Sequence, residues 1–375
     1  MACKANSSVK TFYFYEQSIK IDFKNCTFNC GPAEISETGI IDFYKKINSQ
    51  SFEPVLDQLS SYQKQLNLND WLYYELLYKS IKLGFPNKSK KQIELLSWFL
   101  LNKSGYDTRL SYLNGNLWIY AYSNEEMFEV SMIQDLGKTF INLTDTRLKQ
   151  NEYQTQVYLL DFKPGKGGKS FQFSLNDLPS FAPKKKKVEV DFTYKEEKIH
   201  FDFYIDLSLI GLMNNYPFIQ EQDYLKVPLS QSTKQTLIPN LKKLLEGKNE
   251  KEKLEFLVSF TRKAFKYKED HAYFGKSKPM IAEEVFFHRF SDCEDRCALF
   301  FNLIKETIDL PMLIVALPDH LTIAVASNSR LGSALNYNGR SYYFCDPTGP
   351  FNSSSVGSLP KEYQNSSYQV LEAYK

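Results

Sequence analysis

The stretch "FSDCEDRCALFFNLIKE", residues Phe290–Glu306, decides how the C-terminal part of the chain folds. Ser291 and Asp292 are good N-cap residues, and the acids that follow suit the positive end of a helix dipole. Apolar residues then recur at helical spacing and form one stripe, made of Cys297, Phe300, Phe301, Ile304 and Ile308. The stretch therefore predicts a helix with Cys293 in its first turn and Cys297 one turn further, on the packed face.

A thiol at the start of a helix is subject to two opposing influences. Unpaired backbone N–H groups and the helix dipole favour the thiolate, whereas the acids on either side of Cys293 disfavour it. A cationic partner is needed if Cys293 is to act as a nucleophile. Without such a partner the cysteine is an ordinary packing residue.

Three segments downstream offer partners for this cysteine. "PMLIVAL" (311–317) and "HLTIAVAS" (320–327) predict two strands, with His320 at the start of the second, and "RSYYFCD" (340–346) predicts a strand ending in Asp346. The long loop before the third strand leaves open whether it is a direct hairpin neighbour of the second. A cysteine, a histidine and an aspartate placed in this way can act as nucleophile, base and orienting acid.

The motifs "SDCEDRCALF", "DHLTIAV" and "YYFCDPT" resemble the transglutaminase-like superfamily, over roughly residues 240–350. The resemblance implies a papain-like fold in which Cys293 is the nucleophile, His320 the base and Asp346 the acid that orients the imidazole. With "GPAEIS" near its start, the chain as a whole resembles a group of uncharacterised multi-domain Bacteroidetes proteins of this superfamily.

This resemblance implies cysteine-dependent acyl transfer or hydrolysis of an amide or peptide bond. The substrate is then a peptide, a protein or another amide; water as acceptor makes the enzyme a peptidase or amidase, and an amine makes it a transglutaminase. The backbone N–H of Cys293 contributes to an oxyanion hole, and residues 265–290 contain the side-chain donor. No cofactor is expected, and no Cys/His spacing resembles a zinc site.

Two other functions remain open from the sequence. The first is a catalytically silent binding or scaffold protein of the bacterial envelope, in which the C-terminal site is vestigial. The second, less favoured because nothing indicates a coenzyme A site, is a thiol-dependent acetyltransferase. An open cleft with a contact between Cys293 and His320 favours the enzyme, whereas a buried or disulfide-bonded Cys293 favours the binding protein.

Composition limits the partners and the location of the protein. Its 375 residues are 43% hydrophobic and 24% charged, which is ordinary for a globular protein of two or three domains. A net charge of +2 gives no argument for nucleic acid, and no apolar run approaches the roughly 20 residues that span a bilayer. "MACKANSSVK" contains no signal peptide, which indicates the cytoplasm if this N-terminus is native. The resemblance instead implies the bacterial periplasm or cell envelope, after removal of a signal.

Changes in hydrophobic pattern divide the chain into three predicted domains of an overall α+β protein. Residues 1–147 read as strands, then helices, then strands. Residues 148–228 contain the alternating segments "TQVYLLDF", "KSFQFSL", "KVEVDFTY" and "EKIHFDFYIDL", which predict a β-sandwich-like domain. Residues 229–375 form the transglutaminase-like domain.

A faint repeat relates the two ends of the chain. Residues 87–123 align without gaps on residues 291–327 at an offset of 204, and both read as helix, strand, turn and strand. The alignment puts Ser89 at the place of Cys293 and Asn116 at that of His320, and a slightly smaller offset of 202 puts Thr144 at that of Asp346. Our hypothesis is a degenerate, non-catalytic copy of the same fold in residues 1–147; the alternative is coincidence between common patterns.

Overall fold

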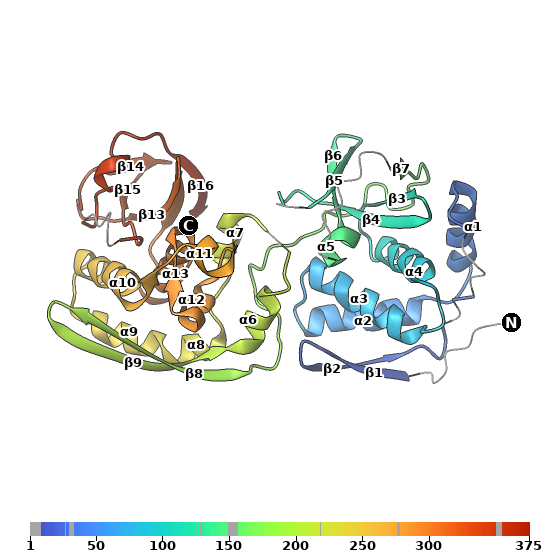
Figure 1. Ribbon diagram of the computed structural model, residues 1–375, viewed down its shortest axis with the longest axis horizontal. Coiled ribbons are helices and arrows are strands. Elements are labelled where there is room, and N and C mark those ends of the chain that lie inside the picture. Colours follow the sequence, from blue (N-terminus) through green and yellow to red (C-terminus); the bar gives the residue numbers. More distant parts are fainter. Residues whose placement is uncertain are drawn as a thin grey trace. The chain divides into compact units, whose positions relative to one another are not determined.

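The computed structural model describes residues 9–26, 28–29, 34–127, 130–148, 157–217, 219–275, 278–349 and 355–375 (Figure 1). The chain divides into two compact units. The first runs to Ser174 and includes Pro179–Ala182 and Tyr216–Gln220, and the second contains Leu175–Leu178, Pro183–Asn215 and Glu221–Lys375. Each unit combines helices with an antiparallel five-stranded sheet, so the predicted α+β class is confirmed. Along the described ranges, none of the helices has both the length and the apolar character needed to cross a membrane.

The first unit opens with a hairpin, continues through helices and ends in its sheet, in the predicted sequence of patterns. Its elements are β1 (Val9–Phe14), β2 (Gln17–Asp22), α1 (Glu37–Asn48), α2 (Glu53–Gln65), α3 (Asp70–Gly84), α4 (Lys90–Lys103), β3 (Thr108–Leu113), β4 (Asn116–Tyr122), β5 (Met132–Asp135), β6 (Lys138–Asn142), α5 (Leu143–Leu148) and β7 (Tyr158–Leu159). The sheet has the strand order β5-β6-β4-β3-β7.

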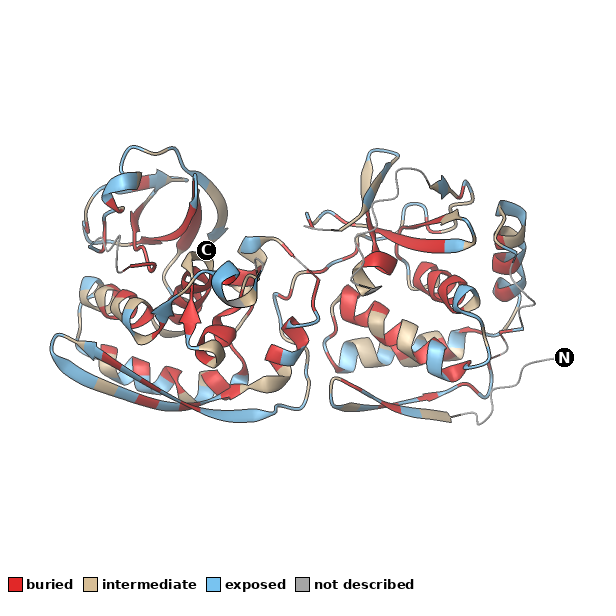
Figure 2. Ribbon diagram, in the orientation of Figure 1, coloured by how far each residue is buried: buried red, intermediate tan, exposed pale blue. Residues whose placement is uncertain are grey.

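Helices α3 and α4 carry much of the core of the first unit. Each begins at a side chain that accepts a backbone N–H of the first helical turn, Asn69 for α3 and Ser89 for α4. Such caps satisfy N–H groups that have no partner inside the helix. Figure 2 shows buried residues along both helices, and they include Trp71 and Trp98.

The second unit also opens with a hairpin and ends in a sheet. Its elements are β8 (Lys185–Tyr194), β9 (Glu197–Asp206), α6 (Leu207–Met213), α7 (Glu221–Lys226), α8 (Gln231–Thr236), α9 (Ile238–Leu245), α10 (Glu250–Ala264), β10 (Lys266–Tyr267), α11 (Asp270–Phe274), α12 (Ala282–His288), β11 (Phe290–Ser291), α13 (Cys293–Thr307), β12 (Met312–Leu317), β13 (His320–Ala326), β14 (Ala334–Tyr337), β15 (Arg340–Phe344), the 3₁₀ helix η1 (Lys361–Tyr363) and β16 (Gln369–Tyr374). The sheet has the order β14-β15-β13-β12-β16, and α13 packs against α7, α10, α12 and β13.

The described residues between 148 and 228 do not form the predicted β-sandwich, and this segment is shared between the two units. In its described part, β8 and β9 form a two-stranded hairpin, whereas "KSFQFSL" buries Phe171 and Phe173 without forming a strand. Alternate residues of the hairpin are buried, and the hairpin packs on helices α8, α10 and α12. Alternation indicates that one face of a strand is covered, but a helix layer and a second sheet give the same pattern.

The two sheets share their strand order and their register. β3 pairs with β4, and β12 with β13, over six residue pairs each; Thr108 opposite Ala121 corresponds to Met312 opposite Val325 at the offset of 204. The register of β4 with β6 is the same as that of β13 with β15, and the register of β5 with β6 is the same as that of β14 with β15. The offset is 204 between β4 and β13, and 202 between β5 and β14 and between β6 and β15. Coincidence between two common patterns would not reproduce register across three strand pairings. The predicted internal repeat is therefore confirmed in strand order and register.

The copy in the first unit holds no catalytic chemistry at the positions that correspond to His320 and Asp346. Asn116 is exposed at the start of β4. Thr144 is buried, and its Oγ1 accepts the backbone N–H of Ile119 at 2.9 Å. The first unit therefore has an exposed amide and a backbone-bound hydroxyl where the second unit has the imidazole of His320 and the carboxylate of Asp346.

The starts of helices α4 and α13 refine the alignment at Cys293. Ser89 caps α4 and Asp292 caps α13, so the two caps correspond at an offset of 203 rather than 204. Lys90, and not Ser89 as the ungapped alignment predicted, therefore lies at the place of Cys293. The shift of one residue falls in the loop between helix and strand, where ungapped alignment is least reliable because loops tolerate changes in length.

Candidate active site

Cys293 is the first residue of α13, as predicted, and Asp292 caps the helix. The Asp292 side chain accepts the N–H of Asp295 at 3.4 Å, and the Asp295 side chain accepts that of Asp292 at 3.2 Å, which forms a capping box. Cys297 is fully buried one turn further along, and its Sγ lies 3.2 Å from the carbonyl oxygen of Leu321. Cys293 is thus presented at the helix start, while Cys297 is a packing residue.

The structure brings His320 and Asp346 together. His320 begins β13, Asp346 follows the end of β15, and His320 Nε2 lies 3.2 Å from Asp346 Oδ1. The same carboxylate oxygen accepts the N–H of Thr348 at 3.1 Å. β13 and β15 are direct antiparallel neighbours, because the long loop between them forms β14, which pairs on the outer side of β15. This answers the question that the loop length left open.

The Cys293 thiol lies beside the start of β13, but its side-chain partner is a carboxylate. The backbone of Leu321 hydrogen-bonds to the sulfur, and the thiol donates to Glu294 Oε2 at 2.8 Å. Within the described part of the chain, no hydrogen bond joins this thiol to His320. Since Asp346 engages Nε2 of the imidazole, Nδ1 is the ring nitrogen that remains to accept the thiol proton.

The acids outweigh the helix dipole at this cysteine. Burial raises the pKa of the Cys293 thiol well above its ordinary value, and the charge of Glu294 and then that of Asp292 raise it further. The backbone hydrogen bond from Leu321 acts in the opposite direction. In this arrangement the thiol is protonated, so a nucleophilic attack requires a base to remove the proton as the bond forms.

Tyr363, which no sequence signal singled out, covers the candidate base. Its ring in η1 stacks on the imidazole of His320, with 5.0 Å between the centroids and 9° between the planes. Burial, followed by a hydrogen bond to Asp319, raises the pKa of Tyr363 to about 12, and the charge of Cys293 contributes as well. The tyrosine ring therefore lies directly against the imidazole of His320.

Tyr267 lies near the thiol within the segment 265–290 that was expected to supply an oxyanion donor. β10 and β11 pair in parallel, which places Tyr267 opposite Ser291, two residues before Cys293. Burial raises the pKa of Tyr267, and the charge of Cys293 is the next largest cause. His288 is another potential donor in the segment 265–290, but its ring packs among the rings of Phe274, Phe287 and Phe290. Tyr267 is thus the better placed donor of the two.

A cluster of carboxylates lies at the start of α13. The sequence did not reveal this cluster, because Asp270 belongs to a separate helix, α11. One oxygen each of Asp270, Asp292 and Asp295 lies within 4.8 Å of the other two. Burial, together with the smaller effects of the charges of Glu294 and Asp270, raises the pKa of Asp292 to about 8. Burial and then Asp292 raise the pKa of Asp295 well above its usual range. Carboxyl groups are thus crowded around this helix start.

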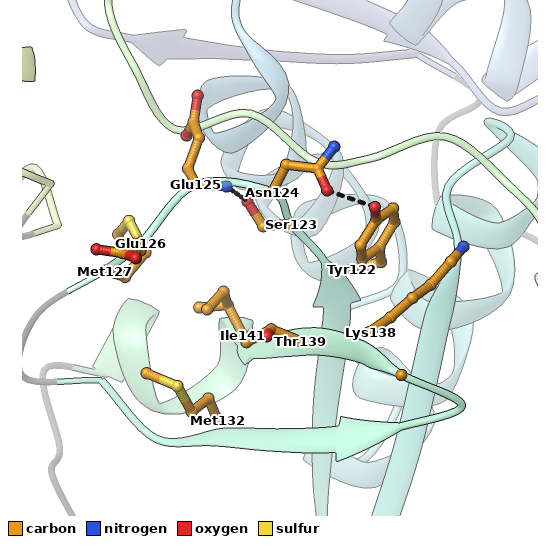
Figure 3. Close-up of a pocket in the computed structure, with 11 residues that line it drawn as sticks. Tyr122, Ser123, Asn124, Glu125, Glu126, Met127, Met132, Lys138, Thr139 and Ile141 are labelled. Carbon is orange, nitrogen blue, oxygen red and sulfur yellow. Dashed lines mark hydrogen bonds between the residues drawn. The ribbon is translucent and has the colours of Figure 1, made fainter. Parts of the chain in front are cut away.

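An open pocket of about 530 Å³ lies in the first unit, beside the end of β4 and the β5–β6 hairpin (Figure 3). Its polar side chains are already engaged: Tyr122 donates to Asn124, the Ser123 hydroxyl donates to the carbonyl of Phe171, and Lys138 pairs with Asp107. The lining residues are Tyr122, Ser123, Asn124, Glu125, Glu126, Met127, Met132, Gly137, Lys138, Thr139 and Ile141. They include no nucleophile paired with a base, so the candidate chemistry is in the second unit.

Replacing Glu294 by Gln is expected to speed alkylation of Cys293 by iodoacetamide about tenfold at pH 7, because it removes a negative charge in contact with the thiol. Loss of that charge lowers the pKa of the thiol, so the rise in rate with pH should begin at lower pH in the variant. Mass spectrometry of the Cys293 peptide from pH 4 to 9 measures this. An unchanged profile would show that the carboxylate does not control the thiol.

A scan for known protein families gave no match, and searches of curated proteins and of solved structures likewise returned no similar protein.

Proposed function

We propose that this chain is a cysteine-dependent enzyme of transglutaminase-like type, which transfers or hydrolyses the acyl group of an amide or peptide bond. The observation that carries the proposal is the pair of His320 and Asp346, whose Nε2 and Oδ1 atoms lie 3.2 Å apart. His320 begins the strand whose next residue, Leu321, lies beside the Cys293 thiol and lowers its pKa through its backbone. A base oriented by an acid beside a thiol at a helix N-terminus is the arrangement that nucleophilic catalysis requires.

In the proposed reaction, the Cys293 thiol turns from Glu294 towards the imidazole. His320 Nδ1 takes the thiol proton as sulfur attacks the carbonyl carbon, and the C–N bond then breaks as the imidazolium returns the proton to the leaving amine. The backbone N–H of Cys293 and the Tyr267 hydroxyl are candidates to stabilise the oxyanion. Water then cleaves the thioester and gives a peptidase or amidase, whereas an amine gives a transglutaminase.

One observation favours a second function, that of a binding or scaffold protein with a silent site. The thiol is protonated and donates to Glu294, and several acids hold it in that form. If the thiol does not leave Glu294, the second unit has no nucleophile. Both proposals place the protein in a bacterial periplasm or cell envelope, as the resemblance to the superfamily suggests.

Alkylation kinetics separate the two functions. Under the enzyme proposal, iodoacetamide modifies Cys293 at pH values well below the thiol's usual pKa of about 8.5, and His320→Ala removes this reactivity. Mass spectrometry reads Cys293 and Cys297 separately from pH 4 to 9. His200→Ala is the matched control, because His200 also contacts an aspartate, Asp191 at 2.8 Å, but on the exposed face of the β8–β9 hairpin.

The control should leave the Cys293 profile unchanged. If Cys293 behaves as an ordinary or buried thiol and ignores the loss of His320, the enzyme proposal loses its chemical basis. The binding or scaffold function is then the one to pursue.

A further inference from the structure

The nucleophile is surrounded by carboxylates from several elements. Glu294 Oε2 contacts the Cys293 sulfur at 2.8 Å. Burial raises the pKa of Glu221 in α7, of Asp292 and of Asp270 in α11. In all three the negative charge of Glu294 raises the pKa further. These residues come from α7, α11 and the start of α13, so the negative charge converges on the site in space rather than along the chain.

This charge is not neutralised inside the protein. Within the described ranges, none of Glu221, Asp270, Asp292 and Glu294 forms an ion pair. The neighbouring cations have other partners. Lys278 pairs with Glu284 at 2.7 Å, and Arg296 donates to the carbonyl oxygens of Phe265, Thr348 and Gly349.

The carboxylate of Asp270 gives an independent indication that this site binds a ligand. It is only 6% exposed, and one carboxylate oxygen accepts the N–H of Lys278 at 2.5 Å. The other oxygen, Oδ1, is buried with no hydrogen-bond partner, while Asp270 offers an oxygen within 4.8 Å of Asp292 and Asp295. A buried acceptor without a donor is costly, and a cationic N–H donor supplied by a ligand would satisfy both its charge and its lone pairs.

We propose that the substrate carries a positively charged group, a guanidinium or an ammonium, next to the carbonyl that Cys293 attacks, and that Asp270, Asp292 and Glu294 bind this group. The inference rests on the proposed function for the identity of the reacting atom. The favoured acyl donor is thus a peptide or amide with a basic residue beside the scissile bond. The field of the acids raises the local concentration of such substrates before any contact forms.

Thiol reagents that differ only in charge test this without a known substrate. Cationic trimethylammonioethyl, neutral methyl and anionic sulfonatoethyl methanethiosulfonates each form a disulfide with Cys293 and release methanesulfinate. The ratio of cationic to anionic rates, divided by the same ratio for a free small thiol, should exceed about tenfold and fall with ionic strength. Because the same thiolate attacks the sulfur of every reagent, the thiol pKa cancels from the ratio.

The variants Glu294→Gln and Asp270→Asn should each lower this ratio several-fold. Glu197→Gln, at the exposed start of β9, is the matched control and should leave it unchanged. Nα-acetyl-arginine amide should also protect Cys293 from the neutral reagent better than its uncharged isostere, Nα-acetyl-citrulline amide. Arginine is used rather than lysine because its guanidinium is a poor acyl acceptor, so the amide does not also serve as the amine in a transfer reaction.

Three outcomes decide the inference. A charge ratio near one, or equal protection by the arginine and citrulline amides, overturns it. Abolition of the ratio by millimolar Mg²⁺ or Ca²⁺, together with calorimetric binding of that ion alone, also overturns it, since the carboxylates would then hold a metal. A high charge ratio together with an absolute rate of Cys293 alkylation that does not change in His320→Ala supports the cationic site while removing the proposed catalysis, so the two failures are distinguishable.

Discussion

Replacing Asp346 by Asn is expected to lower the rate at which Cys293 becomes acylated about 10³–10⁴-fold, with the fold retained. Asp346 Oδ1 accepts from His320 Nε2, which leaves Nδ1 unprotonated and able to take the thiol proton. An asparagine amide can donate to Nε2 instead, and the proton then resides on Nδ1, where the imidazole is useless as a base for the thiol. In this orientation the amide nitrogen takes the place of Oδ1, which also accepts the N–H of Thr348, so the variant gives up that one backbone hydrogen bond.

The release of p-nitrophenol from p-nitrophenyl acetate in a single turnover measures this acylation. Asp191→Asn is the matched control, because it alters the exposed His200–Asp191 pair on the β8–β9 hairpin and should have no effect. A loss of less than about tenfold for Asp346→Asn would show that the carboxylate does not set the tautomer, since a wrong tautomer costs far more than that.

Replacing Arg296 by Met is expected to destabilise the second unit by about 3–5 kcal/mol. Arg296 is fully buried; its Nε donates to Ser291 Oγ at 3.1 Å, and its Nη atoms donate to carbonyls of Phe265, Thr348 and Gly349. It thereby joins the start of α13, the residues after Asp346 and the entry to β10. Burial lowers the pKa of Arg296 to about 10, which still leaves it charged at neutral pH. Methionine fills much of the volume but leaves three buried carbonyl groups without donors.

The positions of the reporters allow each unit to be followed separately in urea. All three tryptophans, Trp71, Trp98 and Trp118, lie in the first unit, so tryptophan fluorescence reports that unit and should not change. Labelling of the buried Cys297 reports the second unit, and its urea midpoint should fall. Arg340→Met, at an exposed position in β15, is the control and should shift the midpoint little. Equal midpoints for the two variants would mean that the buried guanidinium contributes nothing to stability.

The local signals in the sequence were sufficient for the elements that carry the candidate site. The helix that starts at Cys293 follows from a cap and an apolar stripe, and the strands that carry His320 and lead to Asp346 follow from short apolar runs bounded by turns. Because these signals depend on residues a few positions apart, they can be recognised without knowledge of the fold. The repeat could be recognised for the same reason, since its offset preserves the pattern of each strand.

Only the tertiary structure decided what covers each element and which distant side chains meet. The β8–β9 hairpin alternates as a strand of a sandwich would, yet helices bury its inner face. Glu294 was read as an acid that suits the helix dipole, but burial and its contact with the thiol make it the partner that holds Cys293 protonated. Asp270 and Tyr363 reach the site from segments far away in the chain. Such contacts, and the charges they bring together, arise from packing between elements, which local periodicity does not encode.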